Sequence, residues 1–361
     1  MKLKVPFKVN KTAQRDYITY AIVIVAYIVV QALVNTGNIS SLMKGLLVPL
    51  CVYSVLAVSL NLTVGILGEL SLGHAGFMCL GAFGGAFFSK CMVDVITVGW
   101  IRVSLAMIIG ATIAGLFGFL IGMPVLRLKG DYLAIVTLGF GEIVKTIVNA
   151  LYIGRDENGF HFSMKNTVSL NMSESGKVIV KGAQGITGTP KDATFTIGII
   201  LLLITLAVVL NLVRSRAGRA IMAIRDNRIA AESVGINITK YKLMAFTISA
   251  ALAGAAGALY AHNINMLKAE TSNFGYNMSI NILVFVVLGG IGNIRGSIFG
   301  ATVLTLLPEL LRSFDLDNLR MLIYAIVLIL VMLFNWAPKF IEFRERVSVK
   351  VKSFLPKKGG N

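Results

Sequence analysis

RSRAGRAIMAIRDNRIAAESVGINITKYK (residues 214–242) is the stretch around which the rest of the chain is arranged. It carries seven basic and two acidic residues, and it lies between apolar runs at 194–213 and 243–261, each long enough to cross a bilayer. Such a polar segment lies outside the lipid, since charged side chains are costly at membrane depth. Its apolar positions recur at roughly helical spacing before Gly235, a typical helix stop: Ala220, Ile221, Ile224, Ala231 and Val234. We therefore predict a helical docking element.

The composition places the chain in a membrane. Of 361 residues, 56% are hydrophobic and 14% are charged, whereas soluble domains have about 25% charged residues. The formal net charge of +17 does not indicate nucleic-acid binding, because the basic residues gather beside apolar runs, where they determine topology. The cysteines have no CxxC spacing and are interpreted as small buried apolar residues: Cys51, Cys79 and Cys91.

About 20 apolar residues cross a bilayer core, and on that scale the sequence contains about ten spans. The predicted fold is an all-α polytopic membrane protein with spans at 17–34, 43–64, 75–92, 98–122, 131–151, 194–213, 243–262, 278–293, 296–312 and 320–336. The first run is interpreted as an uncleaved span, because it is longer than the apolar core of a signal peptide. Glycine-rich regions at 65–85 and 285–300 predict that some helices are broken or re-entrant, which requires shelter by protein or a water-filled cavity.

The placement of lysine and arginine predicts the orientation, because basic loops stay on the cytoplasmic side. Residues 1–16 and 337–361 are both basic, so both termini are predicted to be cytoplasmic, which requires an even number of spans. Six spans precede residues 214–242, which places this loop in the cytoplasm as well. The predicted division is a basic N-terminus (1–16), a transmembrane domain (17–336) and a basic tail (337–361).

The opposite face receives the loop at 152–193, which is polar and nearly balanced in charge, with five basic and four acidic residues. Its VIVKGAQGITGTP portion (178–190) predicts a short strand followed by a turn. Two interpretations remain open: a contact for an extracytoplasmic partner, or a flexible solvated connection. Elsewhere, NLTVGILGELSLGHAG (61–76) and NILVFVVLGGIGNIRG (281–296) each have an asparagine before an apolar, glycine-rich run, which echoes the internal repeats common in transporters.

Polar side chains inside the predicted spans are candidates for a solute path, because ionisable groups there usually face a cavity or a partner. Glu142 and Lys145 are three residues apart and can pair on one helix face, so they are either a packing pair or part of the path. His74 is either a hydrogen-bonded packing histidine or a path residue, and the wide sequence separation of the histidines argues against a metal site. The candidate set is Asn61, Glu69, His74, Thr137, Glu142, Lys145 and Asn281.

The sequence has no P-loop, no HExxH and no GxSxG motif. We therefore expect that the chain is not an enzyme and needs no cofactor or metal of its own. If it takes part in ATP-driven transport, the ATP must be bound by another subunit.

Five segments occur together in a recognisable order: LNLTVGILGELSLGHAGFMCLGAF (60–83), LRLKGDYLAIVTLGFGEIVK (126–145), GITG (185–188), SRAGRAIMAIRDNRIAAESVGINITKYKLMAFTISAALAGAAGALYA (215–261) and VVLGGIGNIRGSIFGA (286–301). In these segments the chain resembles the permease subunit of branched-chain amino-acid ABC transporters, the longer of the two related permeases in such systems. The similarity covers roughly residues 40–340.

The resemblance implies a multi-pass subunit of the bacterial plasma (inner) membrane. Such a subunit pairs with a second permease to form the path, and two cytoplasmic ATPase subunits dock below it. A solute-binding protein delivers leucine, isoleucine or valine from outside. Related permeases carry simple sugars, nucleosides or urea, which are the alternative substrates. An ion-coupled secondary carrier is the alternative of another class, and it would place a functional carboxylate such as Glu142 in a span.

Permeases of such importers carry a cytoplasmic E-A-A-x-x-x-G motif. Here Ala230, Ala231 and Gly235 match it, while Ile229 replaces the leading glutamate and the downstream proline is missing. In the implied ATPase contact the small residues permit a close fit, and the nearby arginines are either topology anchors or contacts to an acidic surface. The implied ATPase-coupling residues are Arg219, Arg225, Ala230, Ala231 and Gly235.

Overall fold

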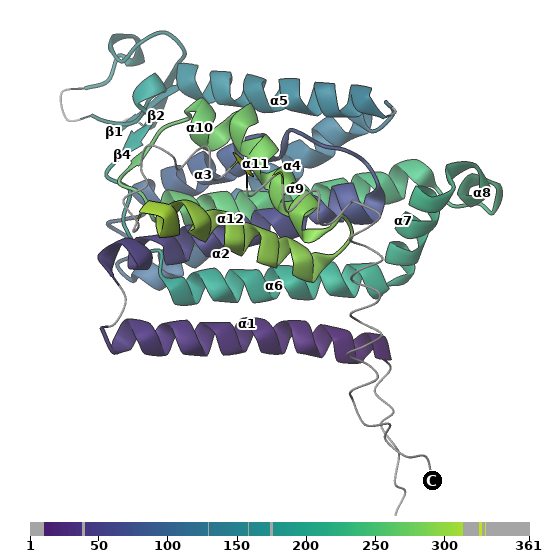
Figure 1. Ribbon diagram of the computed structural model, residues 1–361. Helices are drawn as coiled ribbons and strands as arrows, with labels where there is room; N and C mark the ends of the chain where they lie inside the picture. Colours follow the sequence, from purple (N-terminus) through teal and green to yellow (C-terminus); the bar gives the residue numbers. More distant parts are fainter. Residues whose placement is uncertain are drawn as a thin grey trace, which may run out of the picture.

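The computed structural model describes residues 11–37, 40–128, 130–157, 159–173, 176–312, 325, 326 and 329. Within these residues the chain is a bundle of helices with a small sheet at one end and two short helices projecting at the other (Figure 1). The long helices are α1 Lys11–Asn35, α2 Ser41–Asn61, α3 His74–Cys91, α4 Gly99–Val125, α5 Asp131–Ala150, α6 Phe195–Arg214, α9 Ile238–Ala261, α11 Tyr276–Gly289 and α12 Ile294–Arg312. The short helix α10 spans Thr271–Phe274.

Seven helical stretches are long and apolar enough to cross a membrane: Asp16–Asn35, Ser41–Leu67, Gly99–Val125, Asp131–Ala150, Phe195–Arg214, Ile238–Ala261 and Thr271–Gly289. The spans predicted at 75–92 and 296–312 are the helices α3 and α12, which are not among these seven. The span predicted at 320–336 and the basic tail at 337–361 fall almost wholly outside the described residues. The structure thus confirms a multi-pass helical fold, and the count of ten spans stays a prediction.

Small residues bring three helices of the bundle into close contact. Gly81 of α3, Gly110 of α4 and Gly254 of α9 meet at one place, where a Cβ on Gly110 would lie 2.8 Å from the carbonyl oxygen of Gly81 and 3.0 Å from that of Gly254. Backbone-to-backbone packing of this kind strengthens dispersion contacts in lipid, where no hydrophobic drive brings helices together. The glycine- and alanine-rich stretches of the sequence therefore form the packing centre.

Two helix breaks occur where the glycine-rich regions predict them. The helix α2 continues as a π-helical stretch, Leu62–Leu67, and ends at Gly68, whose φ of +79° favours glycine. Residues 68–73 are non-helical, and α3 begins at His74. The second break separates α11 from α12 at residues 290–293. The prediction of broken helices is confirmed at both places.

A small β-structure corrects the prediction of an all-α fold. The strands β1 Tyr152–Asp156, β2 Gly159–Ser163 and β3 Lys177–Lys181 form an antiparallel sheet in the order β2-β1-β3, while β4 Ile186–Thr187 pairs with β5 Met266–Leu267. The strand expected from VIVK is β3. Alternating apolar side chains build this unit, since Ile153 lies opposite both Phe162 and Val180. The loop at 152–193 is therefore folded over most of its described length, which excludes a wholly flexible connection.

Candidate coupling segment and polar path residues

Residues 214–242 fold into two short helices, α7 Arg216–Asp226 and α8 Arg228–Ser233, before α9 begins (Figure 1). Each helix has a side-chain cap at its start. The Ser215 hydroxyl accepts from the Gly218 amide at 3.1 Å, Asn227 accepts from Ala230 at 3.0 Å, and Asn237 accepts from Lys240 at 3.0 Å. Such caps satisfy amides that the helix leaves unpaired. The predicted helical segment is confirmed, with a corner at Asn227.

Gly235 ends α8 in a left-handed conformation, with φ at +83°. The Gly235 amide donates to the Glu232 carbonyl at 3.0 Å, and the Ile236 amide donates to the Ala231 carbonyl at 3.1 Å. This pair of bonds is a Schellman motif, in which glycine is favoured because it has no Cβ. Gly235 therefore acts as the predicted helix stop.

Ala231 points into the segment, not outward. It is 3% exposed and packs with Ile224 and Ile238 in a small apolar cluster of the segment itself. The exposed apolar side chains of α8 and its end are instead Ile229, at 81%, and Val234, at 74%. Of the small motif residues, Ala230 and Gly235 are exposed and Ala231 is buried. Sequence reasoning treated Ile229 only as a departure from the motif and did not identify it as an exposed apolar residue.

The two arginines singled out from the sequence differ in what they contact. Arg219 is exposed, and its guanidinium donates to the Arg214 carbonyl at 3.2 Å. Arg225 turns back toward the bundle, and its Nη1 donates to the Gly65 carbonyl at 3.1 Å while Nε binds Asp226 at 3.0 Å. Arg225 therefore connects the segment to the break after α2.

Asn61 joins the two helix breaks. Its side chain is fully buried, and its Oδ1 accepts from the Gly292 amide at 2.8 Å while its Nδ2 donates to the Ser297 hydroxyl at 2.9 Å. These partners are more than 230 positions away in the chain. The two segments that share an asparagine and a glycine-rich run thus lie against each other, and their origin as an internal repeat stays a prediction.

Three other candidates lie in or beside the first break. Glu69 forms an ion pair with Lys242, whose side chain is buried. The His74 ring nitrogen Nε2 lies 2.7 Å from the Ser59 hydroxyl, and the Thr137 hydroxyl accepts from the Leu72 amide at 3.0 Å. The bonds of Glu69 and Thr137 fasten the non-helical residues to α9 and α5, and the His74 contact fastens the start of α3 to α2.

Glu142 and Lys145 form the ion pair expected from their spacing. Glu142 also accepts from the Tyr276 amide at 2.8 Å, and Lys145 donates to the Thr271 hydroxyl at 2.9 Å. The pair therefore ties α5 to the start of α10 and of α11, which is the geometry of a packing pair.

Asn281 lines an open cavity of about 580 Å³ between α2, α11 and α12. The cavity has apolar walls with a few polar groups, among them Tyr53, Tyr260, Asn263, Ser272 and Thr305. This is the composition of a site for a small, mainly apolar solute. Asn281 is the candidate residue that reaches this cavity.

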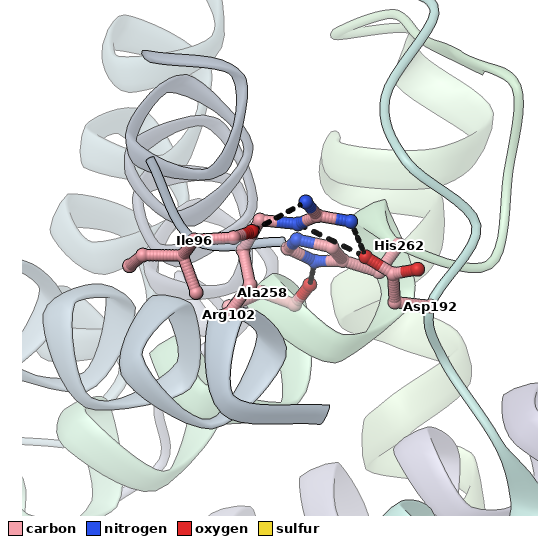
Figure 2. Close-up of polar contacts among 5 residues, drawn as sticks. All are labelled: Ile96, Arg102, Asp192, Ala258 and His262. Carbon is pink, nitrogen blue, oxygen red and sulfur yellow. Dashed lines mark hydrogen bonds and ion pairs between the residues drawn. The ribbon is translucent and has the colours of Figure 1, made fainter. Parts of the chain in front are cut away.

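An ion pair that sequence reasoning missed joins α4 to the chain before α6. The Arg102 guanidinium binds Asp192, with Nε at 3.0 Å, and its Nη1 donates to the Ile96 carbonyl at 2.9 Å; Figure 2 shows these bonds beside His262. His262 is fully buried, and its Nδ1 lies 2.7 Å from the Ala258 carbonyl. The available signal was a pair of opposite charges, each at the start of a predicted span.

A multi-pass helical bundle with two helix breaks and an open cavity fits the class of membrane transport proteins. The family model described as "Branched-chain amino acid transport system / permease component" matches residues 42–332. The chain belongs to that family, which is one of transport components.

Individual relatives refine the comparison. The permease protein LivM of the high-affinity branched-chain amino acid transport system of Salmonella typhimurium is 36% identical over 312 residues, or 84% of this chain and 70% of its own. The LivH permease of Escherichia coli is 24% identical over 286 residues, covering 78% and 88% of the two chains. The fructose import permease FrcC of Rhizobium meliloti is 26% identical over 245 residues, 65% and 64% of the two chains. No solved structure matches the chain.

Proposed function

We propose that this chain is the longer permease subunit of an ATP-driven importer of leucine, isoleucine and valine. The observation that carries the proposal is the similarity to LivM, at 36% identity over 84% of the chain. The similarities to LivH and to the fructose permease are lower, at 24% and 26%. A second permease, two ATPase subunits that bind the ATP and an extracytoplasmic solute-binding protein would complete the importer.

The α7–α8 end of the bundle is proposed to face the cytoplasm. Two observations support this orientation. Five arginines gather between positions 214 and 228, and basic loops remain cytoplasmic. Asp16 of α1 forms an ion pair with Arg214, so the beginning of the chain's first helix lies at the same end. The sheet at the opposite end would then meet the solute-binding protein.

Transport would proceed by alternating access, with ATPase closure displacing α7 and α8. The solute would cross as a neutral zwitterion, and affinity would reside in the external binding protein.

Reconstitution tests the proposal. In proteoliposomes that contain this chain with its partner permease, ATPases and solute-binding protein, we expect ATP-dependent accumulation of leucine, isoleucine and valine, but not of fructose. The chain alone should accumulate none of them. Uphill uptake by the chain alone, driven by an ion gradient, would instead identify a secondary carrier.

The exposed face of α8 yields a prediction for ATPase docking. Changing Ile229 to Glu should weaken ATPase binding at least about tenfold, because burying an unpaired carboxylate in an interface costs more than about 1.4 kcal/mol, the free energy of a tenfold change. The measurement is the affinity of the purified ATPase for the permease pair in detergent. Val168→Glu is the matched control, since Val168 is 81% exposed, like Ile229, but lies at the sheet end. Equal affinities of the two variants would place the docking surface elsewhere.

A further inference from the structure

Side chains from the α7–α9 segment reach the break after α2 at two points. Arg225 donates to the Gly65 carbonyl at 3.1 Å, and its aliphatic stem covers Gly68 so closely that a Cβ there would lie 2.6 Å from the arginine Cγ. Lys242, at the start of α9, forms an ion pair with Glu69. The Lys242 and Glu69 side chains are only 6% and 17% exposed. The segment therefore holds residues 65–69 with a backbone contact and a partly desolvated ion pair.

The break after α2 also contacts the break between α11 and α12. A Cβ on Gly65 would overlap the Gly292 backbone and the Asn61 side-chain oxygen, so the backbones of the two breaks are in close contact beside Asn61. Asn61 adds two buried hydrogen bonds, to the Gly292 amide and to the Ser297 hydroxyl. A displacement of residues 65–69 would therefore also move the junction of α11 with α12.

The joined breaks lie at one end of the open cavity. Tyr53, which lines the cavity, precedes Asn61 by about two turns of α2, and Phe285 precedes Gly292 by about two turns of chain. The Tyr53 and Phe285 rings are 6.0 Å apart between centroids. Along α2 and α11, the cavity therefore lies nearer the sheet end and the buried Asn61 bonds lie nearer the α7–α8 end. The Tyr53–Phe285 ring pair lies between them, at the cavity wall.

We propose that Glu69, Lys242 and Arg225 transmit ATPase movement to the break after α2, and that Asn61 is the latch whose bonds to Gly292 and Ser297 close the cytoplasmic end of the path. This inference rests on the proposed function. It adds the break between α2 and α3 to the elements that the ATPase movement displaces, which otherwise are the adjoining spans α6 and α9. These are positioning residues, since none of them needs to touch the solute. Conformational change in proteins commonly uses contacts between rigid elements that have two alternative arrangements.

The coupling step is tested in the complete importer in proteoliposomes, with ATP hydrolysis and leucine uptake measured on the same samples. For Glu69→Gln and Lys242→Gln we expect uptake per ATP hydrolysed to fall at least tenfold, while hydrolysis by assembled complexes stays within twofold of wild type. The charge-reversed pair, Glu69→Lys with Lys242→Glu, should recover at least a third of the coupling. Arg225→Lys should reduce coupling about threefold, because lysine cannot keep the guanidinium contact to Gly65.

Two controls separate transmission from general destabilisation. Lys268→Gln removes one partner of an exposed pair with Glu270, 3.7 Å apart, and Arg216→Lys makes the same change as Arg225→Lys at the other end of α7. Both should keep wild-type coupling. The contrary result is that ATP hydrolysis and leucine uptake fall in proportion in the Glu69 and Lys242 variants and do not recover in the charge-reversed pair. The ion pair would then have a structural role only, and the proposed transmission of movement would be wrong.

The latch is tested by passive flux. Asn61→Ala removes both bonds, and we expect a leak of leucine down its gradient without ATP, at least fivefold above that of wild type. Ser297→Ala removes one bond and should leak less. The absence of any leak in Asn61→Ala complexes that still bind the ATPases would overturn the latch. Because wild-type uptake is measured first, a failure of the proposed function is seen as absent wild-type uptake, and a failure of this inference as normally coupled or non-leaking variants.

Discussion

Gly254→Val should prevent most of the protein from reaching its folded state in the membrane. A Cβ at Gly254 would lie against the Gly110 backbone and the Ala114 methyl group, and neither neighbour is the end of a flexible side chain. Overpacking a filled core typically costs 1–3 kcal/mol. With backbone as the obstacle, we expect about 3 kcal/mol or more, a large part of the roughly 5–15 kcal/mol that stabilises a folded domain. The measurement is the yield of monodisperse protein and its thermal unfolding in detergent.

Gly139→Val is the matched control. Gly139 is also a helical glycine, in α5, but no atom lies within 4 Å of an added Cβ. We expect its unfolding temperature to stay within a few degrees of wild type. Equal yields and unfolding temperatures for Gly139→Val and Gly254→Val would show that α3, α4 and α9 have room to separate.

Asp192→Leu should cost about 3 kcal/mol of stability, the lower end of the range for removing one partner of a buried ion pair. It leaves the Arg102 guanidinium, 7% exposed, with its bond to the Ile96 carbonyl but no counter-charge. Replacing both residues, as Arg102→Met with Asp192→Leu, should recover most of the loss, because no charge then remains buried. Thermal or denaturant unfolding of the purified protein measures both changes.

The exposed ion pair between Lys268 and Glu270 supplies the comparison. Lys268→Ala should change stability by less than about 1 kcal/mol, as for most surface pairs. If Asp192→Leu and Lys268→Ala have equally small effects, the Arg102 pair is not a structural tie between α4 and the chain before α6.

Local chemistry made much of the fold predictable. The apolar runs predicted the helices, because a span needs about 20 apolar residues. Glycine-rich stretches predicted the two breaks, and Gly235 predicted the end of α8. The spacing of Glu142 and Lys145 predicted their pairing. In each case the signal lies within a few residues of the feature.

Contacts between distant residues were not predictable. Asn61 was a candidate, but its partners Gly292 and Ser297 lie in another helix pair. Ala231 was one of the five residues assigned to ATPase coupling, but its inward direction depends on how α8 packs against Ile224 and Ile238. The motif spacing contains no information about which face of the six-residue helix α8 packs against the rest of the segment.

The short pairing of β4 with β5 has a mechanical consequence. Strand β4 precedes α6 and β5 follows α9, and the Gly188 amide also donates to the Asn265 carbonyl at 3.1 Å. The two helices are thus fastened at the sheet end by these strands and at the other end by α7 and α8 (Figure 1). Because both of their ends are linked, α6 and α9 cannot separate at one end without breaking the β4–β5 pairing or rearranging α7 and α8. We therefore expect a displacement of α7 to move α6 and α9 together.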